Sequence, residues 1–232
     1  MSVLIVVAHP DDEVLGCGAT AAAIAASGRS VRACFLSGHA AARGNRPSDT
    51  ELVADCRAAQ AALGLGEPIF GDFPNIQLNT VPHLTLVQFV ERALVTTRAE
   101  VVFTHHPADL NDDHVHVSRA AQAAVRLWQR GADVPPLRRL YFMEIPSSTD
   151  WALDPSVAAF RPDTFVEAGE AGIDAKLAAL AHYRGVMRDY PHPRSPEVVR
   201  GLAALRGAQA GLRHAEAFQT GFAAGPAASL IG

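Results

Sequence analysis

Cysteine is scarce in this 232-residue chain, and an excess of positive charge is missing. The three cysteines, Cys17, Cys34 and Cys56, are odd in number and lie within apolar segments, which argues against a disulfide framework and favours a reducing compartment. A formal net charge of −4 argues against the basic patches through which proteins bind nucleic acids. The composition therefore excludes a disulfide scaffold and gives no sign of a nucleic-acid partner.

Long apolar runs are also missing. No segment approaches the roughly 20 consecutive apolar residues that a membrane-spanning helix requires, although 49% of the residues are hydrophobic. The N-terminus runs straight into the apolar segment 2–10 and lacks the basic region and cleavage site of a signal peptide. We therefore expect a cytoplasmic globular protein with no membrane span, and a chain of this length can bury a core as one domain.

Apolar strand-like runs alternate with helical segments over the first 145 residues. Continuous β-branched runs are typical of parallel strands that are covered on both faces. The expected strands are 3–8, 31–37, 68–73, 100–106 and 138–145, and the expected helices are 20–28, 48–64, 84–98 and 116–131. Repeated βα units predict an α/β fold with three Rossmann-like layers, in which helices flank an open, mostly parallel sheet.

The pattern changes from about residue 147. Segment 146–165 is rich in turn-forming residues and predicts a loop or short strands. Two helices are expected near 172–189 and 195–212, followed by a frayed tail. No internal repeat or linker separates this loop-rich and then helical part from the rest, so we expect one domain over residues 1–232.

Two polar clusters directly follow expected strands. The first lies in the segment AHPDDE and comprises His9, Asp11, Asp12 and Glu13, and the second is the segment 104–116, THHPADLNDDHVH. In an open α/β sheet, ligands bind in the crevice at the carboxyl ends of the strands. We therefore expect both clusters at the same edge of the sheet.

The imidazole and carboxylate groups of these clusters indicate a divalent metal site. Two histidines and one carboxylate suit a catalytic zinc ion because they leave positions for water, and the same donors suit Fe²⁺. Asp12 stands three residues after His9, so a turn that enters a helix can direct both toward one ion, which leaves Asp11 as a general base on water. We expect His105 and His116 to lie outside the ligand set.

The first cluster is open to two other interpretations. HPDD is also typical of a turn with a helix N-cap and no further role, and the second cluster at a matching strand end argues against it. Segment 16–21, GCGATA, fits the dinucleotide-binding pattern, but it does not follow the strand directly, and no acidic residue for the ribose occurs between Glu13 and Asp49. We reject the dinucleotide interpretation.

Together the clusters resemble the signatures of the LmbE-like, or PIG-L, family of metal-dependent N-deacetylases. That family includes the deacetylases of GlcNAc-phosphatidylinositol and of mycothiol and bacillithiol biosynthesis. AHPDDE matches the first signature in full, and Asp113-His114 matches the Asp-His pair of the second. The similarity extends through segments 143–151, 190–197 and 206–218, and so covers most of the chain.

The resemblance implies a zinc-dependent hydrolase that removes an N-acetyl group from a small amino-sugar conjugate. It assigns His9, Asp12 and His114 as metal ligands and Asp11 as the general base. Family members often carry a further histidine three residues before the last ligand, where this chain has Asn111. An amide can donate a hydrogen bond to an oxyanion, but it cannot act as a general acid at neutral pH.

Asn111 therefore leaves open which group protonates the departing amine. Either Asp11 transfers the proton in both directions or His192 supplies it, and His192 is otherwise a loop residue between two prolines. Asp113 either orients a side chain of the second signature from outside the ligand set or caps the following helix.

The substrate is the least constrained part of the hypothesis. Arg43, Arg57 and Arg194 offer bidentate donors for a phosphate or carboxylate, although such arginines are more often solvated or helix-surface charges. Asn75 is a candidate for a sugar hydroxyl. The alternatives are an N-deacylase of a non-sugar amide in secondary metabolism and a metal-binding homologue without activity. A homo-oligomer is compatible with the alanine-rich helices.

Overall fold

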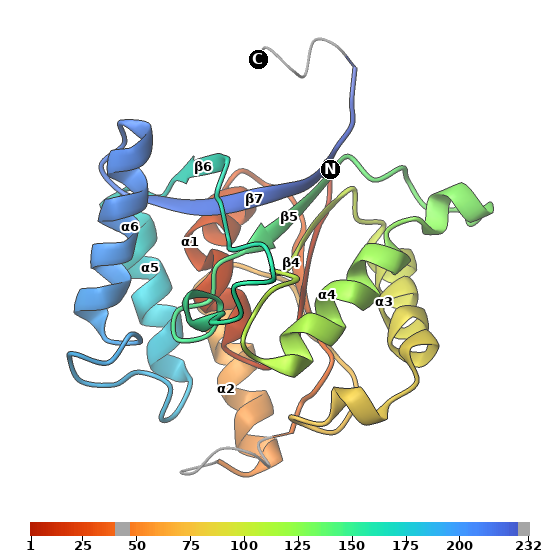
Figure 1. Cartoon of the computed structure of the whole chain (residues 1–232), viewed down its shortest axis with the longest axis horizontal. Coiled ribbons are helices and arrows are strands. Elements are labelled where there is room, and N and C mark those ends of the chain that lie inside the picture. Colours follow the sequence, from red (N-terminus) through yellow and green to blue (C-terminus); the bar gives the residue numbers. More distant parts are fainter. Residues whose placement is uncertain (40–46, 227–232) are drawn as a thin grey trace.

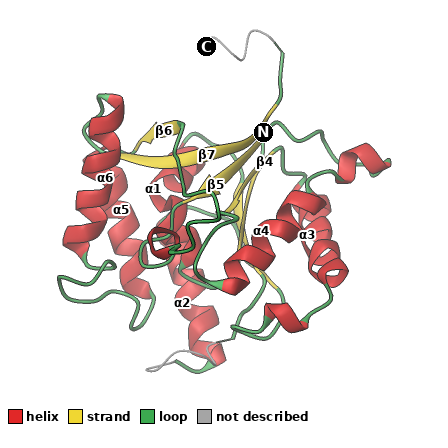
Figure 2. Ribbon diagram, viewed as in Figure 1, coloured by secondary structure: helices red, strands yellow, loops and turns green. Residues whose placement is uncertain are grey.

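The computed structural model describes residues 1–39 and 47–226, which form a seven-stranded sheet between layers of helices (Figures 1 and 2). The order in the sheet is β3-β2-β1-β4-β5-β7-β6. Strands β1 to β5 are parallel, whereas β7 is antiparallel to both β5 and β6. The strands are β1 Val3–Val7, β2 Val31–Phe35, β3 Ile69–Phe70, β4 Val101–His105, β5 Arg139–Met143, β6 Thr164–Glu167 and β7 Ala215–Ala223. The predicted α/β fold with a mostly parallel open sheet is confirmed.

Helices cover both faces of the sheet. One face carries α1 Asp12–Ala26, α2 Asp49–Ala62, α5 Gly169–His182 and α6 Pro196–Ala210, and the other carries α3 His83–Thr97 and α4 Asp112–Ala124 (Figure 1). Three short 3₁₀ helices follow strands or helices in the connections: η1 Leu78–Thr80, η2 Leu127–Arg130 and η3 Thr149–Trp151. In the described ranges, no helix combines the length and apolar character that crossing a membrane requires.

Strand β1 lies inside the sheet, between β2 and β4, and its sequence is apolar throughout because both of its faces are buried. Val3, Ile5 and Val7 belong to the core cluster beneath α1, α2 and α5, whereas Leu4 and Val6 belong to the cluster beneath α3 and α4. All five side chains are buried. A parallel strand covered on both faces leaves no solvent side for polar residues, so its carboxyl end is the first place where polar chemistry can appear.

Two helices begin earlier than the sequence pattern predicts. Helix α1 starts at Asp12 rather than near residue 20, and α4 starts at Asp112 rather than 116. Both helices therefore begin inside the polar clusters. Charged first turns are compatible with helix N-termini because backbone N–H groups point toward acidic side chains there.

The C-terminal part contains the two expected helices, the short strand β6 at the end of the segment where a loop or short strands were expected, and the strand β7, which was not predicted. From β7, the buried Glu216 accepts hydrogen bonds from the backbone N–H groups of Ala19 (3.1 Å) and Thr20 (2.7 Å), just beyond a break in α1 at Cys17. Lys176, the only lysine in the chain, lies 2.7 Å from Glu216 through its Nζ atom. The added strands thus secure the helix that leads out of the first cluster.

Candidate metal centre

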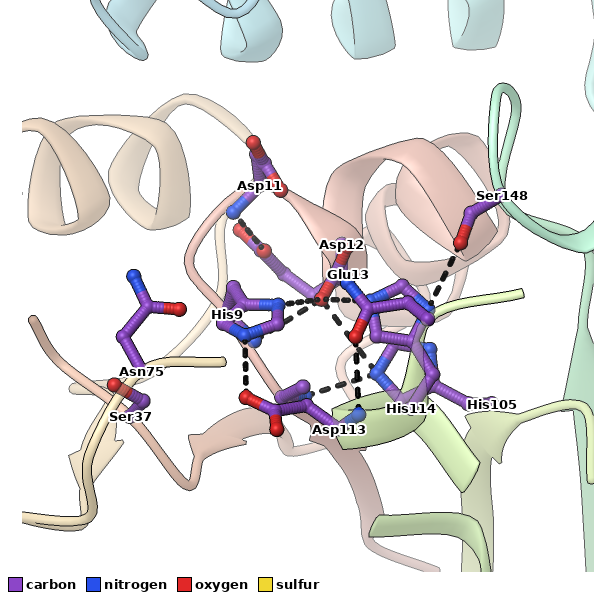
Figure 3. A network of polar contacts seen from close by, with 12 residues as sticks. His9, Asp11, Asp12, Glu13, Ser37, Asn75, His105, Asp113, His114 and Ser148 are labelled. Carbon is purple, nitrogen blue, oxygen red and sulfur yellow. Dashed lines mark hydrogen bonds and ion pairs between the residues drawn. The ribbon is translucent and has the colours of Figure 1, made fainter. Parts of the chain in front are cut away.

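His9, Asp12 and His114 converge at the carboxyl ends of β1 and β4 (Figure 3). His9 follows β1, Asp12 is the first residue of α1, and His114 lies in the first turn of α4. Each offers one ligand atom, and these atoms lie within 4.8 Å of one another. All three residues are buried. The fold therefore brings together the three residues that the sequence assigned to a metal.

Each of the two histidines lies between Asp12 and a second buried carboxylate. Asp12 Oδ2 is 3.4 Å from His9 Nδ1 and 3.3 Å from His114 Nε2. On the opposite side of each ring, His9 Nε2 is 3.0 Å from Asp113 Oδ2, and His114 Nδ1 is 3.2 Å from Asp109 Oδ1. An outer carboxylate holds the proton on the outer ring nitrogen and leaves the inner nitrogen with a lone pair for a cation. The donor set therefore fits a divalent metal ion.

Asp109 is a site residue that the sequence analysis missed. Its carboxylate accepts hydrogen bonds from the hydroxyls of Ser148 and Thr149 and from the backbone N–H of Asn111. Burial opposes its ionised form, but the interactions with His114 and Ser148 outweigh burial and lower the pKa of Asp109 to about 2. Asp109 is thus ionised and fixed from several directions where it meets His114.

The three carboxylates favour positive charge at the centre. Burial lowers the pKa of His114, but Asp12 and Asp109 more than compensate and raise the pKa to about 10. Burial likewise opposes protonation of His9, but Asp113 and Asp12 raise its pKa overall. Because metal ligation requires neutral imidazole, protons and a divalent cation compete for this centre.

His105 packs behind the cluster. Its ring stacks on that of His114 with centroids 3.8 Å apart, and its Nε2 accepts a hydrogen bond from the backbone N–H of Ala8 (2.9 Å). Burial and the neighbouring His114 lower the pKa of His105 to about 3. His105 is therefore a neutral residue that supports the His114 ring. His116 lies on α4 beside Asp112 and is partly exposed.

Asp11 occupies the N-cap position of α1 in a left-handed backbone conformation, with φ 111°. A non-glycine residue in such a conformation is strained and requires support. Glu13 supplies support, because its Oε2 accepts a hydrogen bond from the Asp11 backbone N–H at 3.0 Å. The other oxygen of Glu13 accepts hydrogen bonds from Tyr183 (2.5 Å) and Gln60 (2.8 Å). Glu13, the last residue of AHPDDE, thus has a structural task.

A cavity of about 450 Å³ opens over the cluster. It is lined by His9, Asp11, Asp12, Asn75, Ile76, Leu110, Asn111, Asp112, His114, Ser147, Ser148 and Arg194. Arg194 comes from the loop before α6, and its Nη1 lies 3.3 Å from Asp11 Oδ2. Its Nε donates a hydrogen bond to the hydroxyl of Ser147 (3.0 Å). Residues from both halves of the chain therefore form the walls.

Asn75 and Asn111 both lie in this cavity wall. The Asn75 side chain donates a hydrogen bond to the backbone oxygen of His39 (2.8 Å). Asn111 caps α4, because its side-chain oxygen accepts a hydrogen bond from the Asp113 backbone N–H (3.0 Å). Asp113 is therefore not the cap, and it contacts His9 of the first cluster instead of a side chain of its own segment.

The remaining candidates lie away from the cluster. Arg57 on α2 pairs with Glu67 at 2.6 Å and does not line this cavity. His192 is exposed, is not among the lining residues, and accepts a hydrogen bond from the backbone N–H of Arg194 (3.0 Å). Arg43 lies outside the described residues.

Comparison with known proteins connects the chain to deacetylases. The family model described as "PIG-L: GlcNAc-PI de-N-acetylase" matches residues 4–125. The chain is 27% identical over 190 residues to the uncharacterized deacetylase YaiS of Escherichia coli. This alignment covers 78% of the chain and 90% of YaiS.

Several solved structures share the fold, and two of them show how different its reactions can be. N,N'-diacetylchitobiose deacetylase from Pyrococcus horikoshii superposes with a TM-score of 0.76 at 17% identity and covers 99% of this chain and 88% of its own. The 4-carboxy-2-hydroxymuconate hydratase GalB from Pseudomonas putida has a TM-score of 0.76 at 21% identity and covers 97% of this chain and 98% of its own. Because one is a deacetylase and the other a hydratase, the shared fold does not by itself define the reaction, which depends on the residues of the site.

Proposed function

The chain belongs to the PIG-L family, and we propose that it is a zinc-dependent hydrolase that removes the N-acetyl group from a small amino-sugar conjugate. The wider class, an amidohydrolase of the deacetylase type, follows from the family and from the similarity to YaiS. The observation that carries the proposal is the buried His9, Asp12 and His114 cluster with the Asp11 carboxylate beside it in one cavity.

His9, Asp12 and His114 are the proposed metal ligands. Two imidazoles and one carboxylate, with outer carboxylates behind both imidazoles, are typical of catalytic zinc sites, and Fe²⁺ suits the same donors. When bound, such an ion polarises the acetamide carbonyl and lowers the pKa of water. The outer carboxylates Asp109 and Asp113 hold the two rings in the orientation that ligation needs.

Asp11 is the proposed general base. It takes one proton from water as the water oxygen bonds to the carbonyl carbon. As the C–N bond breaks, Asp11 returns a proton to the amine nitrogen, and acetate and a free amine leave. Asp11 is favoured over His192 for the second transfer because it lines the cavity, whereas His192 does not. Arg194, 3.3 Å from Asp11, holds the carboxylate in position.

Asn75, Asn111 and Arg194 are the proposed contacts to substrate. The buried Oδ1 of Asn75 has no hydrogen-bond partner among the described residues, so it suits a hydroxyl or N–H donor of an acetamido sugar. Asn111 uses its side-chain oxygen to cap α4, and its amide N–H₂ group suits the developing oxyanion. Support for a sugar substrate comes from the family description and from the diacetylchitobiose deacetylase.

The test is acetate release by the zinc-loaded protein from a substrate panel. The panel contains N-acetylglucosamine, N,N'-diacetylchitobiose, alkyl N-acetylglucosaminides and N-acetylated amines without a sugar. Acetate from the sugar amides, abolished in Asp11→Asn with zinc content retained, supports the proposal. Acetate from the non-sugar amides alone would favour the N-deacylase, and zinc binding with no turnover of any amide would favour a non-catalytic homologue.

A further inference from the structure

Two large apolar side chains line a cavity whose other described lining residues are polar or charged. Ile76, in the loop between β3 and η1, is 52% exposed, and Leu110, in the loop between β4 and α4, is 55% exposed. Single exposed apolar residues are common on protein surfaces and need no explanation. Two exposed apolar residues at one cavity indicate a binding role only if the fold fixes both of them at that cavity.

Ile76 is held there against its backbone preference. Its φ is 58°, in the left-handed region that a β-branched residue rarely occupies. Asp113 fixes this conformation, because its Oδ2 accepts a hydrogen bond from the Ile76 N–H at 2.7 Å, and its Oδ1 accepts one from Leu78 at 2.9 Å. The same Oδ2 atom contacts His9. Strain of this kind is typical of functional segments.

Leu110 directly follows the second outer carboxylate, Asp109, in the sequence. It stands between Asp109, which holds His114, and Asn111, which caps α4. Its backbone N–H donates to the carbonyl oxygen of Ser148 at 3.4 Å. Ile76 is therefore bound by the carboxylate that contacts His9, and Leu110 directly follows the carboxylate that contacts His114.

We propose that Ile76 and Leu110 form an apolar subsite at this cavity, and that the substrate carries an alkyl or aryl substituent on its N-acetylated sugar. This inference rests on the proposed function. The polar lining suits the acetamide and the sugar hydroxyls, and burial of an apolar substituent against Ile76 and Leu110 adds hydrophobic free energy that a bare sugar cannot provide.

The test compares the methyl and hexyl β-glycosides of N-acetylglucosamine. Burial of one methylene changes affinity about fourfold, so we expect the hexyl glycoside to have a kcat/KM about tenfold or more above that of the methyl glycoside, through a lower KM. The affinity of both glycosides for the zinc-loaded protein is also measured by calorimetry. This second measurement requires no turnover and therefore separates failure of the subsite from failure of the proposed function.

Three variants locate the preference. Ile76→Asn and Leu110→Asn should each reduce the hexyl preference at least threefold, while the control Leu153→Asn, at an exposed leucine that does not line the cavity, should retain it. Asparagine tolerates positive φ, so Ile76→Asn should also raise the Tm by about 2 °C or more. Ile76→Leu keeps the apolar surface and should keep the preference.

Higher stability together with lost apolar preference in Ile76→Asn would support a binding role, because a residue kept for packing would lose stability. The proposal is overturned if the wild-type protein binds both glycosides equally. It is equally overturned if the preference survives both asparagine substitutions.

Discussion

Substitution of Asp109 by asparagine should weaken zinc binding without unfolding the protein. The variant keeps the size of the side chain but removes the charge that lies 3.2 Å from His114 Nδ1. It also places an N–H₂ group where one carboxylate oxygen accepts hydrogen bonds from Ser148 or Thr149. The His114 ring therefore loses both the charge that holds its proton on Nδ1 and part of the network that fixes its orientation.

The expected loss is about 10- to 100-fold in zinc affinity, the range typical of outer partners of metal-ligating histidines, or about 1.4 to 2.7 kcal/mol. Competition with a chromophoric chelator measures the affinity, and circular dichroism checks the fold. Asp112→Asn is the matched control, because it removes the same charge three residues further along the chain, where Asp112 pairs with His116 instead of a proposed ligand. A folded Asp109→Asn variant that binds zinc within twofold of wild type would refute the reasoning.

Three further predictions concern stability and positioning. In the metal-free protein, the raised pKa of His114 means that the folded state keeps a proton that the unfolded state releases above pH 6.5. The free energy of unfolding should therefore fall between pH 6.5 and pH 10, with a slope of up to about 1.4 kcal/mol per pH unit. Urea titrations with and without zinc should show this slope only in the metal-free sample. Lys176→Met leaves Glu216 buried without its cation and should cost about 3–5 kcal/mol, whereas adding Glu216→Gln should recover part of that loss in the same assay. Glu13→Gln weakens the hydrogen bond that supports the strained Asp11 backbone. We therefore expect a lower kcat at unchanged zinc content and a loss of about 1–3 kcal/mol in the free energy of unfolding. An unchanged kcat would contradict a role of Glu13 in positioning Asp11.

The parallel sheet could be predicted because its signal is local. β1 is apolar throughout because it is buried on both faces, and α2 begins with a capping box in which Ser48 and Glu51 satisfy each other's backbone N–H groups. The starts of α1 and α4 were predicted too late, because the polar motifs themselves form their first turns. β7 was missed because its place between β5 and β6 is decided by long-range antiparallel pairing.

The two polar clusters could be placed at one edge of the sheet because parallel strands end together. The residues that hold the carboxylates of the site in place could not be predicted, because they come from distant parts of the sequence. Ser148 and Thr149 reach Asp109 from a turn 39 and 40 residues away, and Arg194 reaches Asp11 across 183 residues. Asp109 itself lies five residues before His114 in the same polar segment, 104–116, and this position after an expected strand indicates a role in the site.

The measurement that tests the central claim most directly is zinc content and acetate release from N-acetylated amino sugars for wild type, His114→Ala and Asp11→Asn, all purified identically. The account predicts about one zinc per chain in wild type and in Asp11→Asn, much less in His114→Ala, and acetate from wild type alone. Full zinc content in His114→Ala, or undiminished acetate release by Asp11→Asn, would contradict the assignment of this cluster as the metal and base site.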